Sequence, residues 1–221
     1  MQKEIKLAPS VFAADLGRLK EQLSVLEENH VELLHVDVMD GHFVERMAFG
    51  ADHVRMLKQM TSLPLDVHLM VEKPEVHLES MITAGADIIT VHQESTTRLL
   101  SCLQKIRERG VKAGVALSPA TSEDTIRYLL DELDMILLMT VNPGEGGQHF
   151  LTAVVDKVRR VRAMIGDRDI DLEVDGGIDS RTIRICREAG ANVFVSGGYL
   201  FKGDISTNIS ELRSNCIERS F

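Results

Sequence analysis

Histidine and aspartate residues cluster in one apolar stretch of this sequence. The segment "LHVDVMDGHF" contains His35, Asp37, Asp40 and His42, although a buried strand normally excludes charge because an unpaired ion loses its hydration there. Side chains alternate along a strand, so His35 and Asp37 share one face, and burying both without a metal or a partner would be costly. The pair therefore indicates a metal-binding site. Asp40 and Asp179 have a simpler interpretation, because an aspartate at a strand end often caps the next helix.

Two further apolar segments supply residues of the same types. His68 lies between Val67 and Leu69, so we expect its ring on the opposite face of the strand from theirs. Asp175 directly precedes a Gly-Gly pair. Two imidazoles and two carboxylates would make a tetrahedral site that suits Zn²⁺, Fe²⁺ or Mn²⁺, because it lacks the thiolates that softer metals favour. The predicted ligands are His35, Asp37, His68 and Asp175.

Three glycine clusters follow apolar segments near the C-terminus: "NPGEGGQ" (Asn142–Gln148), "DGGI" (Asp175–Ile178) and "SGG" (Ser196–Gly198). Glycine lets backbone N–H groups approach an anion closely. A single glycine turn is explained by a left-handed backbone conformation alone. Three of them at neighbouring strand ends predict a phosphate-binding site.

The elements that would position these residues repeat along the chain. Short apolar segments alternate with longer charged segments of helical periodicity, and eight such units predict parallel strands joined by crossover helices. An open sheet usually has about five or six strands, whereas eight units match a closed (β/α)₈ TIM barrel, whose active site lies at the carboxyl ends of the strands. The expected strands are Ile5–Ala8, Leu33–Val38, Leu65–Met70, Ile88–His92, Lys112–Leu117, Met135–Val141, Leu172–Val174 and Val193–Ser196.

The expected helices have one apolar face and defined ends. In 16–28 the apolar stripe consists of Leu16, Leu19, Leu23 and Leu26, and in 154–165 it consists of four valines and an isoleucine. Gly85, Gly110 and Gly190 each precede an expected strand, as glycines that end helices do. No linker or low-complexity tract divides the chain, so we expect residues 1–221 to form a single (β/α)₈ barrel domain.

Composition narrows the class of protein. Of 221 residues 44% are hydrophobic, as in an ordinary globular protein. The net charge of −9 disfavours nonspecific binding to nucleic acid or anionic lipid. The cysteines Cys102, Cys186 and Cys216 are widely spaced and odd in number, as in a protein of a reducing compartment. The sequence shows no signal-peptide pattern and no apolar segment long enough to cross a membrane. We therefore expect a cytoplasmic protein with neither a nucleic-acid nor a membrane partner.

The order of these motifs resembles the ribulose-phosphate 3-epimerase family along essentially the whole chain. The stretches that carry the resemblance are "LAPSVFAADL", "LHVDVMDGHFV", "DVHLMVEKPE", "VHQE", "AGVALSPAT", "MTVNPGEGGQHF", "EVDGGI" and "SGGYLF". The resemblance implies a single TIM barrel of the ribulose-phosphate-binding type. It also implies a metal-dependent epimerase that inverts C3 of a ketose phosphate, converting D-ribulose 5-phosphate to D-xylulose 5-phosphate. Family members assemble into homo-oligomers from dimers to hexamers, so we expect such an assembly here.

The resemblance also assigns roles to individual residues. One divalent cation per subunit, zinc first and iron, manganese or cobalt as alternatives, would be held by His35, Asp37, His68 and Asp175. Asp37 and Asp175 would act as the acid/base pair on the two faces of a metal-stabilised cis-enediolate. Met39, Met70 and Met139 would line the pocket. The substrate would contact Ser10, His68, Gly144, Glu145, Gly146, Gly147, Asp175, Gly176, Gly177, Gly197 and Gly198.

Several positions depart from the family pattern. The usual "GHFVPN" is "GHFVERM" here, with Glu45, Arg46 and Met47, and "LNPAT" becomes "LSPAT". Glu145 replaces the phenylalanine of "PGFGGQ", and its carboxylate would repel a phosphate unless it points outward or pairs with a cation such as Arg46. Gly198 replaces a serine and removes a hydroxyl donor. These changes leave the proton chemistry intact but leave open another ketose phosphate, such as D-allulose 6-phosphate or a tetrulose phosphate.

Two other functions are less consistent with the residues. Related sugar-phosphate decarboxylases carry an Asp-x-Lys-x-x-Asp motif, and "HVDVMD" lacks that lysine; no lysine ends an expected strand where an aldolase would need one for a Schiff base. A noncatalytic sugar-phosphate binder that kept the fold would be expected to have lost a metal ligand or an acid/base carboxylate. All four predicted ligands are present.

Overall fold

The computed structural model describes residues 3–216. In that range nine strands form one sheet in the order β1-β9-β8-β7-β6-β5-β4-β2-β3. The strands are β1 (Lys6–Pro9), β2 (Leu34–Asp40), β3 (Met47–Ala48), β4 (Leu65–Met70), β5 (Ile88–His92), β6 (Lys112–Leu117), β7 (Met135–Met139), β8 (Asp171–Asp175) and β9 (Val193–Ser196).

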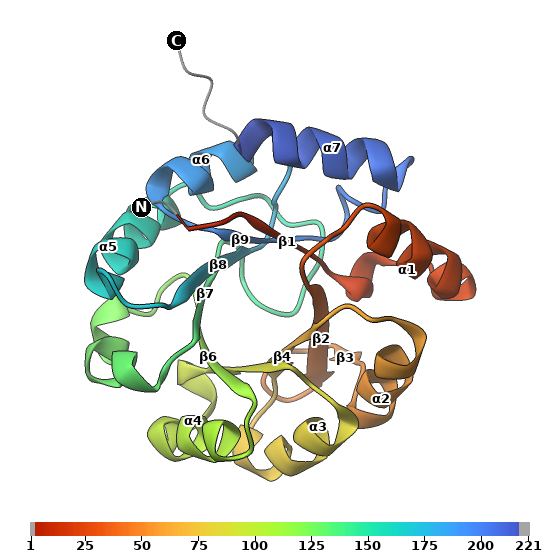
Figure 1. The fold of residues 1–221 in the computed structure, drawn as a ribbon. Helices are drawn as coiled ribbons and strands as arrows, with labels where there is room; N and C mark the ends of the chain where they lie inside the picture. The colour runs from red at the N-terminus through yellow and green to blue at the C-terminus, as the bar shows by residue number, and fades with distance from the viewer. Residues whose placement is uncertain (1–2, 217–221) are drawn as a thin grey trace.

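The sheet closes on itself. Every neighbouring pair from β1 round to β2 through β9 is parallel. The remaining gap between β1 and β2 is bridged where Leu33 N donates to Leu7 O at 3.3 Å and where Ser10 and His35 form an isolated parallel bridge. Figure 1 looks into the ring of strands, and helices surround it. The predicted (β/α)₈ barrel is therefore confirmed.

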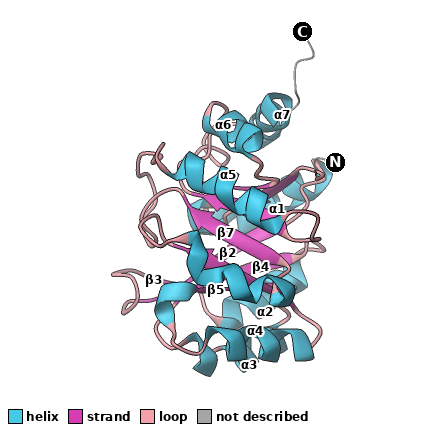
Figure 2. Cartoon of the chain, turned by 90° about the vertical axis from the view of Figure 1, so that its left-hand side faces the viewer, coloured by secondary structure: helices cyan, strands magenta, loops and turns pink. Residues whose placement is uncertain are grey.

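Helices cover the outside of the barrel, as the side view in Figure 2 also shows. The α-helices are α1 (Leu19–Glu28), α2 (Ala51–Met60), α3 (Leu78–Ala84), α4 (Leu99–Glu108), α5 (Val154–Ile165), α6 (Thr182–Ala189) and α7 (Ile205–Cys216). Short 3₁₀ helices are η1 (Val11–Ala13), η2 (Leu16–Arg18), η3 (Pro74–Val76) and η4 (Gln93–Ser95), and the longer η5 (Glu123–Glu132) follows β6. No helix in the described range is long and apolar enough to cross a membrane.

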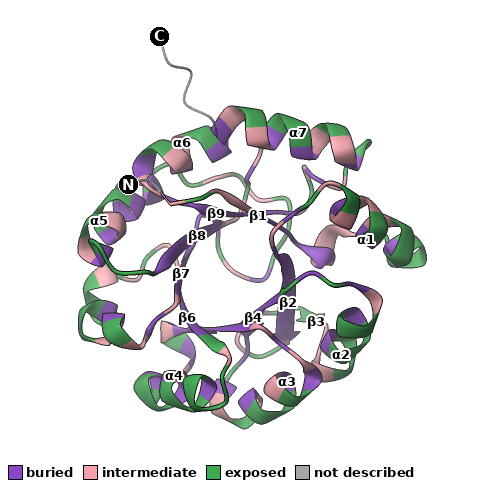
Figure 3. Ribbon diagram, in the orientation of Figure 1, coloured by how far each residue is buried: buried purple, intermediate pink, exposed green. Residues whose placement is uncertain are grey.

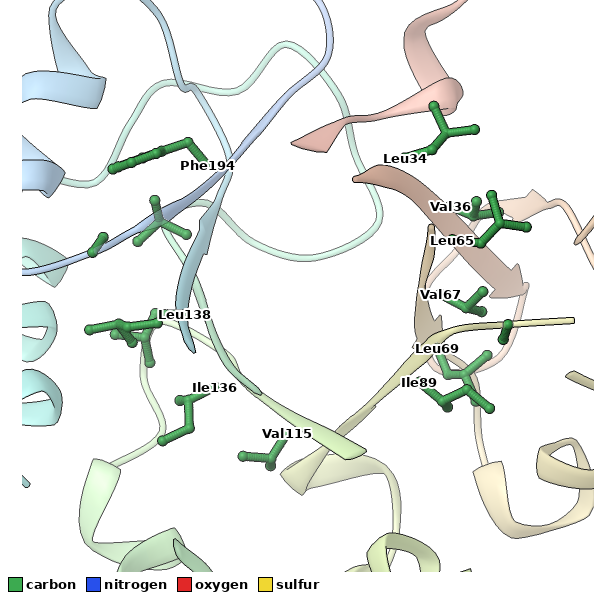
Figure 4. Packing of buried hydrophobic residues seen from close by; sticks show 14 of the residues in the cluster. Leu34, Val36, Leu65, Val67, Leu69, Ile89, Val115, Ile136, Leu138 and Phe194 are labelled. Atoms are coloured by element: carbon green, nitrogen blue, oxygen red, sulfur yellow. The ribbon is translucent and has the colours of Figure 1, made fainter. Parts of the chain in front are cut away.

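The apolar core lies between the strands and the helices. Leu34 and Val36 on β2, like Val67 on β4, point outward to this layer, where they are fully buried (Figure 4). Figure 3 shows buried residues along the strands and on the inward faces of the helices. Because side chains alternate on a strand, the same β2 segment directs His35 and Asp37 into the barrel. The alternation of side chains along β2 therefore places apolar residues in the core and polar residues in the barrel interior.

Four of the expected strands begin or end one or two residues away from the observed bounds, and two further details differ from the sequence expectations. Leu16 is 65% exposed, although Leu19, Leu23 and Leu26 are buried as predicted. The reason is that the Asp15 side chain accepts a hydrogen bond from Gly17 N and starts a 3₁₀ turn, so Leu16 lies outside the α-helical stripe. The structure also adds β3, a two-residue strand antiparallel to the end of β2. The predicted helix ends are confirmed, because Gly85, Gly110 and Gly190 all have positive φ.

Candidate metal centre and pocket

The four predicted metal ligands come from β2, β4 and β8 and lie close together. One ligand atom from each of His35, Asp37, His68 and Asp175 lies within 4.8 Å of the others. Asp37 Oδ1 is 3.4 Å from His35 Nε2 and 3.3 Å from His68 Nδ1. Asp175 Oδ2 is 4.0 Å from His68 Nδ1. Strand register explains the meeting, because Asp37 pairs directly with His68 across β2 and β4.

The atoms that face one another in this cluster fit a bound cation. His35 Nε2 and His68 Nδ1 are buried and have no hydrogen-bond partner among the described residues. Their other ring nitrogens are engaged, His35 Nδ1 with Asp66 Oδ2 at 2.6 Å and His68 Nε2 with His92 Nε2 at 2.9 Å. A buried nitrogen without a partner is costly. Two imidazole nitrogens beside two carboxylates form the kind of donor set that holds Zn²⁺ or Fe²⁺.

Electrostatics distinguish the two carboxyl groups. Burial, and then the negative charge of Asp37, raises the pKa of Asp175 to about 7. Burial also opposes the charge of Asp37, but His35 and His68 outweigh it and hold the pKa of that carboxyl well below its usual range. Burial likewise opposes a charge on His35, but Asp37 and Asp66 raise its pKa well above the ordinary value. Asp37 therefore favours the ionised form, whereas Asp175 holds a proton more readily.

Two buried carboxyl groups beneath the cluster were missed by the sequence analysis. Asp66 on β4 and Glu173 on β8 are fully buried, and each offers an oxygen near His35 Nδ1. Burial, and then the charge of Asp66, raises the pKa of Glu173 well above its usual value. Both lie two positions before a predicted ligand, His68 or Asp175, and so on the same face of the strand. That spacing was a usable signal in the sequence.

A cavity of about 430 Å³ opens above the cluster. His35 and His68 lie below it, fully buried, and are not among its lining residues. The three methionines that the resemblance placed there, Met39, Met70 and Met139, do line the cavity. The predicted substrate residues that line it are Ser10, Gly144, Glu145, Gly146, Gly147, Asp175, Gly176, Gly177, Gly197 and Gly198.

Positive charge also reaches the cavity. Arg181 and Lys202, which the sequence analysis did not single out, belong to its lining. Both follow glycine clusters, Arg181 after "DGGI" and Lys202 after "SGG". A cation shortly after a glycine-rich strand end was therefore the signal available for finding them.

The glycines of the cavity differ in whether a larger residue could replace them. Gly176 has φ +119°, and a Cβ there would lie 2.4 Å from Val141 Cγ2, so only glycine fits. A Cβ on Gly198 would meet nothing within 4 Å. The residue at 198 is therefore free to vary, and the loss of a serine hydroxyl there is not imposed by packing.

The two acidic residues that the sequence left ambiguous have clear environments. Glu145 is exposed at the cavity, and no ion pair joins it to Arg46 within residues 3–216. Arg46 instead places its guanidinium 5.8 Å from the centre of the Phe12 ring. Asp40 accepts backbone hydrogen bonds from His42 at 2.8 Å and from Glu72 at 2.7 Å. Asp40 therefore ties the loop after β2 to the loop after β4.

Ser10, which directly follows β1, supports the cluster. Its hydroxyl donates to Asp37 Oδ2 at 2.5 Å, which leaves Oδ1 to face the histidines. The Ser10 side chain is nearly fully buried and also lines the cavity. Ser10 therefore orients Asp37 at the point where the cavity meets the cluster.

Comparisons with known proteins match nearly the whole chain to one family. A family model described as the ribulose-phosphate 3 epimerase family matches residues 6–201. Ribulose-phosphate 3-epimerase of Bacillus subtilis (strain 168) is 43% identical over 215 residues, covering 96% of this chain and 99% of that protein. Ribulose-phosphate 3-epimerase of Rhodobacter capsulatus is 40% identical over 219 residues, covering 96% of each.

Solved structures with this architecture are more distant in sequence. A 3-keto-L-gulonate-6-phosphate decarboxylase from Vibrio cholerae has a TM-score of 0.74 at 16% identity, covering 97% of this chain and 98% of that chain. A mutant tryptophan synthase α-subunit from the hyperthermophile Pyrococcus furiosus has a TM-score of 0.69 at 17% identity, covering 97% of this chain and 100% of that chain. At such identities the likeness concerns the barrel fold alone.

Proposed function

This chain belongs to the ribulose-phosphate 3-epimerase family, and we propose that it inverts C3 of a ketose phosphate, interconverting D-ribulose 5-phosphate and D-xylulose 5-phosphate. The observation that carries the proposal is the meeting of His35, Asp37, His68 and Asp175 at the floor of one cavity. The names of relatives that are 40% or more identical over nearly the whole chain support it. We also propose that the enzyme is a cytoplasmic homo-oligomer, as the family resemblance implies.

One divalent cation, with Zn²⁺ as the first candidate, would be held by His35, Asp37, His68 and Asp175. When bound, such an ion supplies Lewis acidity that makes a hydrogen beside a ketone easier to remove. The fit rests on the two buried imidazole nitrogens that no other described residue satisfies. The buried carboxylate of Asp66, 2.6 Å from His35 Nδ1, would fix the ring so that Nε2 faces the ion.

Asp37 and Asp175 would move the protons. Asp37 lies within β2 and Asp175 ends β8, and these two strands lie across the barrel from each other (Figure 1). Inversion at carbon requires a proton to leave from one face and return on the other, so two groups on opposite sides of the substrate serve it. One carboxyl group must be ionised and the other protonated at the start of each turnover. The different pKa values of Asp37 and Asp175 support that division.

The remaining cavity residues would bind the phosphate. Backbone N–H groups in the glycine clusters after β7, β8 and β9 suit a phosphate dianion. Arg181 and Lys202, which also line the cavity, would add positive charge. His68 lies too deep to line the cavity and would act on the substrate only through the cluster.

The site determines the identity of the sugar less closely than it determines the reaction. A second candidate substrate is therefore another ketose phosphate. Glu145 at the cavity and the glycine at 198 favour it, because both change the surroundings of the phosphate. An epimerisation assay over D-ribulose 5-phosphate, D-allulose 6-phosphate and a tetrulose phosphate tests the choice. We expect the highest kcat/KM with D-ribulose 5-phosphate. Turnover of none of the three would contradict the proposed epimerase activity.

We predict that Glu145→Phe and Gly198→Ser lower KM for D-ribulose 5-phosphate. The first removes a negative charge beside the phosphate, and the second adds a hydroxyl donor where space is open. A hydrogen bond to a charged group contributes about 1.5–3 kcal/mol, so a KM about tenfold lower is expected for the serine variant. Steady-state kinetics on the same panel measures the effect. Unchanged KM and unchanged preference in both variants would show that these positions do not select the sugar.

A further inference from the structure

The two histidines of the metal centre are held in different ways. His35 Nδ1 contacts a carboxylate directly, that of Asp66. His68 Nε2 instead contacts a second imidazole, His92 Nε2, at 2.9 Å, and His92 Nδ1 lies 3.0 Å from Glu94 Oε2. The His68 and His92 rings are fully buried and stacked, with centroids 5.0 Å apart. His68 is therefore also linked to a carboxylate, that of Glu94, but through the His92 ring and not directly.

Only one arrangement of protons lets this chain of contacts serve a metal ligand. His68 Nδ1 faces Asp37 and Asp175, so a lone pair on that nitrogen requires the ring proton on Nε2. That proton is then donated to His92 Nε2, which must be unprotonated. The His92 proton consequently lies on Nδ1 and is donated to Glu94 Oε2. The hydrogen bond to Glu94 thus sets the tautomer of His92, and the His92 tautomer sets that of His68.

We propose that Glu94 and His92 are positioning residues that fix the His68 tautomer with Nδ1 free for the cation. The proposal rests on the metal site of the proposed function and adds two residues to it. Carboxylate groups commonly orient metal-binding histidines from behind. Here the orientation is transmitted through a second imidazole, from η4 and β5 to β4.

Glu94 is itself fixed in one orientation. Its Oε1 accepts from Ser118 N at 2.8 Å and from the Thr121 hydroxyl, so Oε2 alone remains for His92. The loop that carries Ser118 is held in turn by buried Lys157, whose Nζ donates to Ser118 O at 3.0 Å and to Pro119 O at 2.7 Å. The carboxylate therefore cannot rotate freely to exchange its oxygens.

This fixed orientation makes Glu94→Gln a directional test. The Ser118 backbone N–H at Oε1 can only donate, so the glutamine oxygen takes that place and its NH₂ faces His92 Nδ1. The relay then reverses: His92 Nδ1 accepts, His92 Nε2–H donates to His68 Nε2, and His68 carries its proton on Nδ1. The nitrogen that faces Asp37 and Asp175 would no longer offer a lone pair.

The experiment measures the tautomer and the metal affinity separately. Nitrogen-15 NMR of histidine-labelled, metal-free protein reports which ring nitrogen of His68 is protonated, and competition with a chelator gives the Zn²⁺ affinity. We expect Nε2–H in the unsubstituted protein and Nδ1–H in Glu94→Gln, with Zn²⁺ affinity lower by about 10–100-fold in that variant. Glu132→Gln, a change of the same type at a half-buried position at the end of η5, should alter neither.

Substitutions of His92 separate orientation from packing. In His92→Gln the side-chain oxygen can accept from His68 Nε2–H, whereas His92→Leu fills space without any polar atom. We expect Zn²⁺ affinity in the glutamine variant to lie closer to that of the unsubstituted protein. Equal affinities in the two His92 variants, or an unchanged His68 tautomer in Glu94→Gln, would overturn the proposal. Failure of the unsubstituted protein to bind Zn²⁺ would instead remove the metal site itself, so the two failures are distinguishable.

Discussion

Replacing Asp175 with asparagine is expected to lower kcat for epimerisation by about 10²–10⁴-fold, the contribution typical of a positioned acid or base. Asp175 ends β8 beside the cavity, and its carboxyl group lies next to His68 and within 4.8 Å of a ligand atom of Asp37. Asparagine keeps the shape and an oxygen but cannot hold or release the proton. Asp37→Asn is expected to lose a similar factor, because inversion needs both faces of the carbon.

Hydrogen isotope exchange at C3 can show which face of the carbon each of the two carboxyl groups serves. If Asp37 and Asp175 each serve one face, a variant that lacks one of them still exchanges the C3 hydrogen of a single epimer without inverting it. We expect Asp175→Asn and Asp37→Asn to exchange opposite epimers. NMR of D-ribulose 5-phosphate and D-xylulose 5-phosphate incubated separately in D₂O measures the exchange. Exchange of both epimers by either variant would contradict the assignment of one face to each carboxyl group.

Asp171→Asn provides a control on the same strand. Asp171 begins β8 at the opposite end of the barrel, where its carboxylate pairs with Lys6 at 2.6 Å. The substitution should lower the melting temperature, because the ion pair is lost, and it should leave kcat unchanged. An Asp175→Asn enzyme that still epimerises at the normal rate would contradict the proposed role of that carboxyl group.

The barrel could be predicted because its strands are short, strongly apolar and repeated. An outward-facing residue such as Val36 packs against the helices, whereas an inward-facing residue such as His35 lies inside the barrel. The alternation of apolar and polar residues in the sequence therefore indicates which face of a strand each residue occupies. The same alternation made His35, Asp37, His68 and Asp175 recognisable as one cluster. Their convergence follows from the rule that parallel strands in a barrel present their carboxyl ends on one face.

What the sequence did not reveal depends on partners far along the chain. The spacing of Asp66 and Glu173 places them on the inward faces of their strands, but their common contact with His35 appears only in the folded barrel. The role of Glu94 depends on backbone and hydroxyl donors from the loop after β6. Leu16 fits a helical stripe by spacing, but the Asp15 cap produces a 3₁₀ turn there. Local turn chemistry and long-range hydrogen bonds are both invisible to periodicity.

Removing the bound cation is expected to abolish epimerisation and to lower the melting temperature. The predicted ligands come from β2, β4 and β8, so an ion that they share links strands distant in sequence and binds only the folded chain. At a free ion concentration of 100 times Kd, such binding stabilises a protein by about 2.7 kcal/mol. For a chain of this size we expect a shift of about 5–10 °C. Metal analysis, differential scanning calorimetry and the epimerase assay, before and after chelation, measure the three effects.

Restoring Zn²⁺ should recover both activity and stability, and His68→Gln provides the control for the chelator. That variant loses the proposed metal ligand His68 Nδ1, so chelation should change its melting temperature little. A general effect of the chelator on the fold would shift the variant and the unsubstituted protein alike. Chelated protein that contains no metal but epimerises at the original rate would show that Asp37 and Asp175 act without the ion, and the metal site would then be rejected as part of the mechanism.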